Sequence, residues 1–149
     1  MKYIQLTKNM KAIVDDDMFD ELSKYDWYFD SRGYAMRATR KNGKTIFIAM
    51  HRVVNGTADG LMTDHINHNR LDNRRSNLRS CTRSENVCNA KFISNSGHKG
   101  IHLTKNGTYQ TKVQKDGVVH YLGTFKTVKE AKNARKEAVM RLHGEFAYM

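Results

Sequence analysis

The chain has 149 residues, enough for one ordinary domain or two small ones, and its 26 Lys and Arg against 15 Asp and Glu give a formal net charge of +11. Residues 64–149 hold most of the excess, with sixteen basic and seven acidic side chains, which favours a partner that is a polyanion such as nucleic acid. Nothing resembles a signal peptide or a membrane span, and two cysteines separated by six residues can neither build a disulfide framework nor close a tetrahedral zinc site unaided.

Residues 1–49 predict a small β-sheet with one short helix. Four strands are expected, at residues 3–6, 11–14, 33–38 and 45–49. The last two flank Asn42-Gly43, a dipeptide that strongly favours a hairpin turn. The acidic run at 16–23 suits one or two helical turns, and we interpret it as a solvated helix start rather than a metal site. The neighbouring aromatic residues are expected in the core: Tyr25, Trp27, Tyr28 and Phe29.

Residues 50–90 predict two strands and two helices around a long polar loop. The expected elements are a helix at 50–54 and strands at 61–65 and 77–81. Thr82 and Glu85 match the capping-box pattern, which starts a second helix that continues to residue 90. Long ordered loops are usually functional, so the polar loop between the two strands is the first place to look for chemistry.

The loop opens on Asp64-His65 and continues through several Asn and Arg residues. A carboxylate can hold a divalent metal ion, and an imidazole can take a proton from water near neutral pH. Arginine side chains offer forked donors that suit a phosphate group. Together these parts predict hydrolysis of a phosphodiester.

After an expected linker at 94–98 the pattern changes to three strands and a helix. The strands are expected at 100–103, 109–114 and 118–122, and a second capping box at Thr127 and Glu130 opens a helix that ends near Gly144. On the middle strand, Tyr109, Thr111 and Val113 would face this helix, so Gln110, Lys112 and Gln114 would face outward. A polar face of this kind suits the DNA major groove, and a merely solvated face is the alternative.

These motifs resemble two known families. Residues 51–79, with Asp64-His65, Asn77 and the helix at Asn86, resemble the HNH nuclease domain of phage and intron-encoded homing endonucleases. Residues 99–147 are similar to the AP2/ERF DNA-binding domain, which microbial HNH endonucleases often carry at the C-terminus. The resemblance implies an α+β fold: a small N-terminal β-sheet and a ββα-metal nuclease fold, then a three-stranded antiparallel sheet packed on one helix. The implied domains are 1–93 (HNH nuclease, with its ββα-metal core at about 50–91), 94–98 (linker) and 99–149 (AP2/ERF-like).

The resemblance also implies roles for single residues. Asp64 and Asn86 match the metal ligands, His65 matches the general base, and Asn77 matches the middle Asn, which braces the loop by hydrogen bonding. Many HNH enzymes have His where this chain has Asn86, and hard oxygen ligands favour Mg²⁺ or Mn²⁺ over Zn²⁺. The residues expected to bind DNA are His51, Arg52, His68, Arg70, Arg74, Arg75, Arg79, Lys99, His102, Thr104, Gln110, Lys112, Gln114 and Tyr121.

Two histidines have alternative roles. His51 is expected to be packed or to touch a phosphate, with a catalytic role as the alternative. His68 is expected to contact DNA from the loop, although it could also be a second metal ligand or a substitute base.

The expected function is a metal-dependent, homing-type endonuclease that hydrolyses phosphodiester bonds in double-stranded DNA and nicks one strand per monomer. The alternative is a sequence-specific DNA-binding regulator with an inactive nuclease domain, and an RNA-binding protein would leave the Asp64-His65 pair unexplained. We expect a monomer with no membrane partner, in the cytoplasm of a bacterium or a phage-infected host cell, and a dimer is the alternative assembly.

Overall fold

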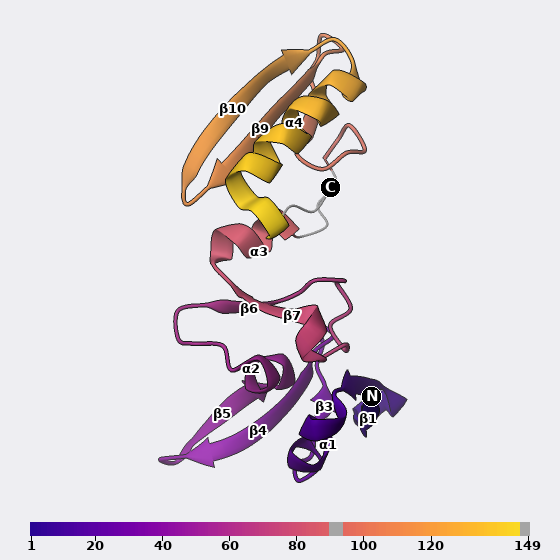
Figure 1. Ribbon diagram of the computed structural model, residues 1–149, viewed down its shortest axis with the longest axis vertical. Helices are drawn as coiled ribbons and strands as arrows, with labels where there is room; N and C mark the ends of the chain where they lie inside the picture. The colour runs from indigo at the N-terminus through magenta and orange to yellow at the C-terminus, as the bar shows by residue number, and fades with distance from the viewer. Residues whose placement is uncertain (90–93, 147–149) are drawn as a thin grey trace. The chain divides into compact units, whose positions relative to one another are not determined.

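The computed structural model describes residues 1–89 and 94–146, and its contacts divide the chain into two compact units, Met1–Cys81 and Thr82–Met149 (Figure 1). This division falls ahead of the linker expected at 94–98. Residues 94–98 form a turn that is tied to the following strand, because the Asn95 side chain both donates to and accepts from the Leu103 backbone, at 3.0 Å each. The helix of the expected ββα core therefore groups with the C-terminal residues, and the assignment of 1–93 and 99–149 as domains stays a prediction.

The first unit is built from small antiparallel sheets and short helices. Its strands are β1 (Lys2–Gln5), β2 (Lys11–Val14), β3 (Tyr28–Phe29), β4 (Ala35–Lys41), β5 (Lys44–Ala49), β6 (Met62–His65) and β7 (Leu78–Cys81). Its helical segments are η1 (Thr7–Asn9), α1 (Asp16–Leu22), α2 (Met50–Asn55) and η2 (Arg75–Asn77). In these sheets β1 pairs with β2, β4 lies between β3 and β5, and β6 pairs with β7. The hairpin predicted at Asn42-Gly43 forms, and both residues have positive φ, as a tight hairpin turn requires.

One apolar core holds the first unit together. Val14, Leu22, Met50 and Leu78 are buried in it, so β2, α1, α2 and β7 all contribute. Trp27 is buried as predicted, and its indole N–H donates to the Leu22 carbonyl at 2.8 Å. Each large side chain of this kind contributes about 1.5–3 kcal/mol on burial, which fixes β7 and α2 beside the polar loop.

The prediction that Tyr25 lies in the core is wrong, because its side chain is 45% exposed. Residues 23–26 form a turn after α1 rather than a strand, so an alternation of buried and exposed positions does not extend to them. The Tyr25 ring instead lies against the guanidinium of Arg37, whose Cζ is 3.9 Å from the ring centroid. Tyr28 and Phe29 form the short edge strand β3 and are half-buried.

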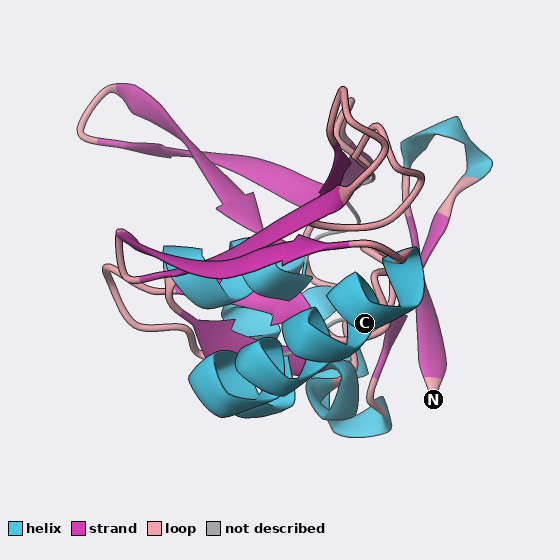
Figure 2. Ribbon diagram, turned by 90° about the horizontal axis from the view of Figure 1, so that it is seen from above, coloured by secondary structure: helices cyan, strands magenta, loops and turns pink. Residues whose placement is uncertain are grey.

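The second unit contains a three-stranded antiparallel sheet with a helix packed on one face (Figures 1 and 2). Its elements are α3 (Arg83–Asn89), β8 (Ile101–Leu103), β9 (Tyr109–Lys115), β10 (Val118–Phe125), α4 (Val128–His143) and η3 (Gly144–Phe146). Val113, Ala138 and Val139 are buried between β9 and α4. The sheet order is β10-β9-β8, so the strand predicted to be central is central. In the part of the chain that the structure describes, no helix is long and apolar enough to cross a membrane.

Both predicted capping boxes form. The Thr82 hydroxyl accepts from the Glu85 N–H, and the Glu85 carboxylate accepts from the Thr82 N–H at 2.8 Å. The Thr127 hydroxyl and the Glu130 carboxylate make the same reciprocal pair at the start of α4. Each box satisfies donors that a helix N-terminus leaves without partners, so α3 and α4 begin where the sequence predicts. Residue 90, the predicted end of the first of these helices, lies outside the described residues.

Candidate active site

The polar loop between β6 and β7 is held by its own side-chain amides. The buried Asn77 side chain donates to the Asp72 carbonyl at 2.8 Å and accepts from the Asn67 N–H at 3.0 Å. Asn67 also donates to the Asp72 carboxylate at 2.9 Å. Asn77 thus joins the beginning of the loop to its end, which is the bracing geometry expected of this residue.

The same loop is docked on β2 of the unit's core. The Ile13 N–H donates to the Leu71 carbonyl and the Asn73 N–H donates to the Ile13 carbonyl, both at 2.8 Å. The guanidinium of Arg74 makes two hydrogen bonds to the buried Asp72 carboxylate, at 2.7 and 2.6 Å, and this ion pair holds the pKa of Asp72 below its usual range. Backbone and side-chain bonds therefore fix the loop on both sides.

His65 lies at the start of this loop and is buried. Its Nε2 is 3.2 Å from the Asn73 amide oxygen, which can only accept, so Nε2 carries the proton and Nδ1 is the basic nitrogen. Burial lowers the pKa of His65, and hydrogen bonding to Asn73 partly opposes this shift. At neutral pH the imidazole is therefore uncharged, the state that a general base needs.

Two further rings pack around His65. The ring centroids of His51 and Tyr34 lie 5.2 and 6.0 Å from that of His65, and 5.0 Å from each other. Burial, helped by the nearby His65, lowers the pKa of His51 to about 4, so His51 is a neutral packing partner at pH 7. The guanidinium of Arg70 lies over the ring of Tyr34, with its Cζ 4.9 Å from the ring centroid.

Sequence reasoning missed Tyr34 and Asn73. Tyr34 precedes β4 and carries no motif, and Asn73 looks like any other amide of an Asn-rich loop. The sequence does show that Asn73 has a hydrogen-bond acceptor and lies eight residues after His65. That spacing does not predict a contact, because the contact depends on the docking of the loop on β2.

Asp64 forms a buried ion pair with Arg79. The two residues lie directly opposite each other on β6 and β7, and Arg79 Nε and Nη2 are 3.0 and 2.9 Å from Asp64 Oδ2. The side chains are 8% and 14% exposed, so the guanidinium supplies the opposite charge that a buried carboxylate requires. Arg79, predicted to grip DNA, thus touches the candidate metal ligand.

The other expected metal ligand, Asn86, lies on α3 in the second unit, and its pairing with Asp64 at one metal ion stays a prediction. No group of three or more His, Cys, Asp or Glu side chains that could hold a metal ion occurs within residues 1–89 and 94–146. The donor types nevertheless fit a hard cation, since a carboxylate and an amide oxygen are the ligands that Mg²⁺ and Mn²⁺ accept.

Other arginines expected at DNA have partners within the first unit. Arg52 donates to the Leu61 carbonyl at 2.8 Å, Arg70 donates to the Arg32 carbonyl, and Arg75 pairs with the exposed Asp17. His68 lies near the start of the loop and has a positive φ of 64°, and its N–H donates to the His65 carbonyl. These groups shape the loop, and contact with DNA stays a prediction for each of them.

The predicted outward face of the second unit's sheet is present. Gln110, Lys112 and Gln114 are exposed on β9, and cross-strand pairing sets His102 beside Gln110 and Tyr121 beside Lys112. Tyr121 is 58% exposed. The other two residues of this unit that were expected to contact DNA have partners within the chain. The half-buried Thr104 bonds Thr108 through its hydroxyl at 2.7 Å, and Lys99 donates to the Cys88 carbonyl of α3.

Comparisons with known proteins agree with this reading of residues 49–88, which match a family model described as HNH endonuclease. An uncharacterized HNH endonuclease of Acanthamoeba polyphaga mimivirus is 32% identical over 146 residues, which cover 94% of this chain and 74% of that protein. Among solved structures, the HNH homing endonuclease I-HmuI aligns with 96% of this chain and 91% of its own, at a TM-score of 0.40 and 20% identity. The chain belongs to the HNH endonuclease family.

Proposed function

We propose that this HNH endonuclease is a metal-dependent enzyme of the homing type, which hydrolyses phosphodiester bonds in duplex DNA and nicks one strand per monomer. The observation that carries the proposal is the buried, neutral His65, whose basic nitrogen is set by Asn73 and whose neighbour Asp64 is paired with Arg79. An active site with one base serves one strand at a time, so a double-strand break would need a second copy or a second turnover.

The metal ion is proposed to be Mg²⁺ or Mn²⁺, with the Asp64 carboxylate and the Asn86 amide oxygen as protein ligands. When bound, such an ion stabilises the negative charge of the phosphate and of the leaving 3′ oxygen.

The chain's own groups do the rest of the chemistry. His65 Nδ1 takes a proton from a water molecule, whose oxygen attacks the phosphorus in line with the leaving 3′ oxygen. The P–O3′ bond breaks, the leaving 3′ oxygen takes a proton from solvent water, and the products are a 5′-phosphate and a 3′-hydroxyl end. Asn73 keeps His65 in the required tautomer, and Asn77 keeps the loop in place, so we assign both as positioning residues.

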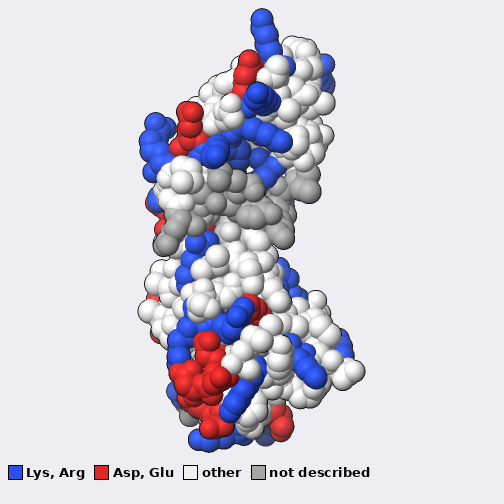
Figure 3. Space-filling view, turned by 45° about the vertical axis from the view of Figure 1, so that its right-hand side comes forward, with Lys and Arg blue, Asp and Glu red and all other residues white. Residues whose placement is uncertain are grey.

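DNA recognition is proposed to come from the second unit, as an AP2/ERF-like domain. Residues 82–149 carry twelve Lys and Arg against five Asp and Glu, and Figure 3 shows basic side chains gathered on the face of this unit turned to the viewer. We propose that the open face of β8, β9 and β10 enters the major groove, where strands can reach base edges. His102, Gln110, Lys112, Gln114 and Tyr121 would then choose the target, as a monomer.

The proposal is tested by incubating the protein with supercoiled plasmid, with and without Mg²⁺. We expect metal-dependent conversion of supercoiled to relaxed circular DNA, and no conversion by Asp64→Ala. End-labelled duplex, with the labelled strand varied, would then show which strand is cut. A protein that binds the duplex but leaves it intact under every metal condition would instead be a DNA-binding regulator with an inactive nuclease domain.

A further inference from the structure

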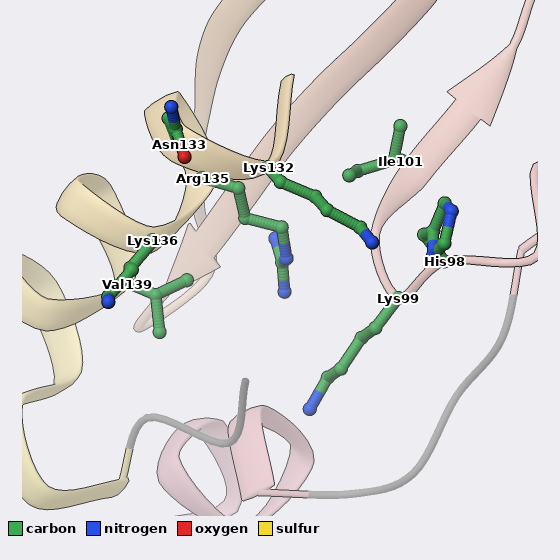
Figure 4. A pocket seen from close by; sticks show the side chains of 8 residues that line it. All are labelled: His98, Lys99, Ile101, Lys132, Asn133, Arg135, Lys136 and Val139. Carbon is green, nitrogen blue, oxygen red and sulfur yellow. The ribbon is translucent and has the colours of Figure 1, made fainter. Parts of the chain in front are cut away.

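A basic pocket lies in the second unit between α4 and the turn that leads into β8 (Figure 4). Its volume is about 400 Å³, and four of its lining residues are cations: Lys99, Lys132, Arg135 and Lys136. Within the described residues, no carboxylate lines it. Figure 4 shows Arg135 reaching into the space from α4 and Lys99 from the opposite wall, with Lys132 along the rim.

The charge on this face of α4 is not balanced within the helix. Lys132, Arg135 and Lys136 are three and four residues apart, so they lie on one face, where like charges destabilise a helix. None of the ion pairs that the structure shows among its described side chains involves Lys132, Arg135 or Lys136. An anionic ligand bound against this face would relieve the repulsion between the three cations.

The backbone is shaped to let the guanidinium of Arg135 approach. Gly100 has φ +63°, and a Cβ added there would lie 2.5 Å from Arg135 Cζ, so a side chain at residue 100 would displace the guanidinium. Arg135 Nη1 also donates to the Lys112 carbonyl at 3.0 Å. Arg135 is therefore held in one place, with its fork at the pocket.

Burial of the cations costs free energy that a bound anion would recover. Burial lowers the pKa of Arg135, because the guanidinium loses water and no carboxylate among the described pocket residues replaces it. A phosphate group would supply negative charge there and accept hydrogen bonds from a guanidinium and ammonium groups at once.

We propose that this pocket is a binding site for a phosphate group, supplied by a free phosphate ester or by the backbone of DNA. The site is separate from the open sheet face, because Thr111 and Val113 of β9 face α4 whereas Gln110, Lys112 and Gln114 face away from it. The proposal therefore stands whether or not the open face reads bases.

The test is a calorimetric titration of the full chain with pyrophosphate at low salt. We expect saturable binding, weakened about tenfold by Lys132→Gln, which corresponds to about 1.4 kcal/mol. Lys129→Gln is the matched control, since it removes the same charge from an exposed position of α4 outside the pocket. Thermal unfolding of both variants checks that the fold is unchanged. Absence of saturable binding, or equal weakening by the control, would overturn the proposal.

Competition identifies the source of the phosphate. If duplex DNA displaces pyrophosphate, the pocket holds a backbone phosphate, and Lys132→Gln should also reduce the salt dependence of DNA binding by about one charge. If pyrophosphate binds equally well to the DNA complex, the ligand is a free phosphate ester.

Discussion

Replacing Asn73 tests how the loop prepares His65. The side chain is fully buried, and its amide oxygen accepts from His65 Nε2 at 3.2 Å. Asn73→Ala leaves that N–H buried with its acceptor removed, which costs about 1–3 kcal/mol of folding free energy. The remaining effect should fall on the rate, because the imidazole loses the bond that fixes its tautomer and orientation.

The pH dependence of cleavage should shift in opposite directions for two substitutions. The hydrogen bond to Asn73 raises the pKa of His65, so Asn73→Ala should move the acid limb of the rate profile to lower pH, by about 0.5–1 unit for a bond of about 1 kcal/mol. Asn73→Asp keeps an acceptor and adds negative charge, so it should raise the pKa of His65 and move the limb to higher pH, by about 1–3 units.

The assay is single-turnover cleavage of supercoiled plasmid at saturating Mg²⁺, from pH 4.5 to 9, with urea unfolding of each variant alongside. Because the base must be neutral, the wild-type rate should rise with pH through the lowered pKa of His65 and then level off. If both substitutions moved the acid limb the same way, or neither moved it, the rate would not follow the protonation of His65 and the reasoning would be refuted.

Three further predictions concern stability. In the folded protein the pKa of His51 is lowered to about 4 from an ordinary 6.5, so between these pH values the unfolded chain binds one more proton than the folded chain. About 3 kcal/mol of stability should therefore be present above pH 6.5 and be lost as the pH falls to 4. Urea unfolding of His51→Phe over the same pH range should show a smaller loss of stability. Arg79→Met should cost about 3–5 kcal/mol by leaving Asp64 buried and uncompensated, and adding Asp64→Leu should restore most of it; no recovery in thermal or urea unfolding would contradict the buried ion pair. Asn77→Ala removes the partners of two backbone groups and should cost about 2–4 kcal/mol, with faster hydrogen exchange confined to residues 66–77; unchanged exchange there would contradict the bracing role.

The elements that the sequence predicts well depend on neighbours in the chain. The capping boxes at Thr82 and Thr127 need only a residue three positions on, and the Asn42-Gly43 hairpin needs only its own dipeptide. The alternation along β9 likewise predicts its buried and exposed faces from the strand itself. The Asp64-His65 pair can be recognised in the sequence for the same reason, because its two residues are adjacent in the chain.

The partners of the loop side chains could not be predicted, because they come from distant parts of the chain. Arg75 pairs with Asp17, which lies 58 residues earlier, and Asn73 reaches His65 only because the loop docks against Ile13 of β2. A basic residue next to a phosphodiesterase motif suggests a phosphate contact, yet Arg74 and Arg79 bind the chain's own carboxylates. Tertiary packing determines which partners these side chains have, and the periodicity of the sequence does not predict that packing.

The central claim is that His65 is the base that activates water for DNA cleavage. The most direct measurement is the single-turnover cleavage rate of His65→Ala at saturating Mg²⁺, with its affinity for the same duplex measured in parallel. We predict a rate about 10²–10⁴-fold below wild type, with unchanged affinity, because general base catalysis contributes that much. Cleavage by His65→Ala at the wild-type rate would contradict the account.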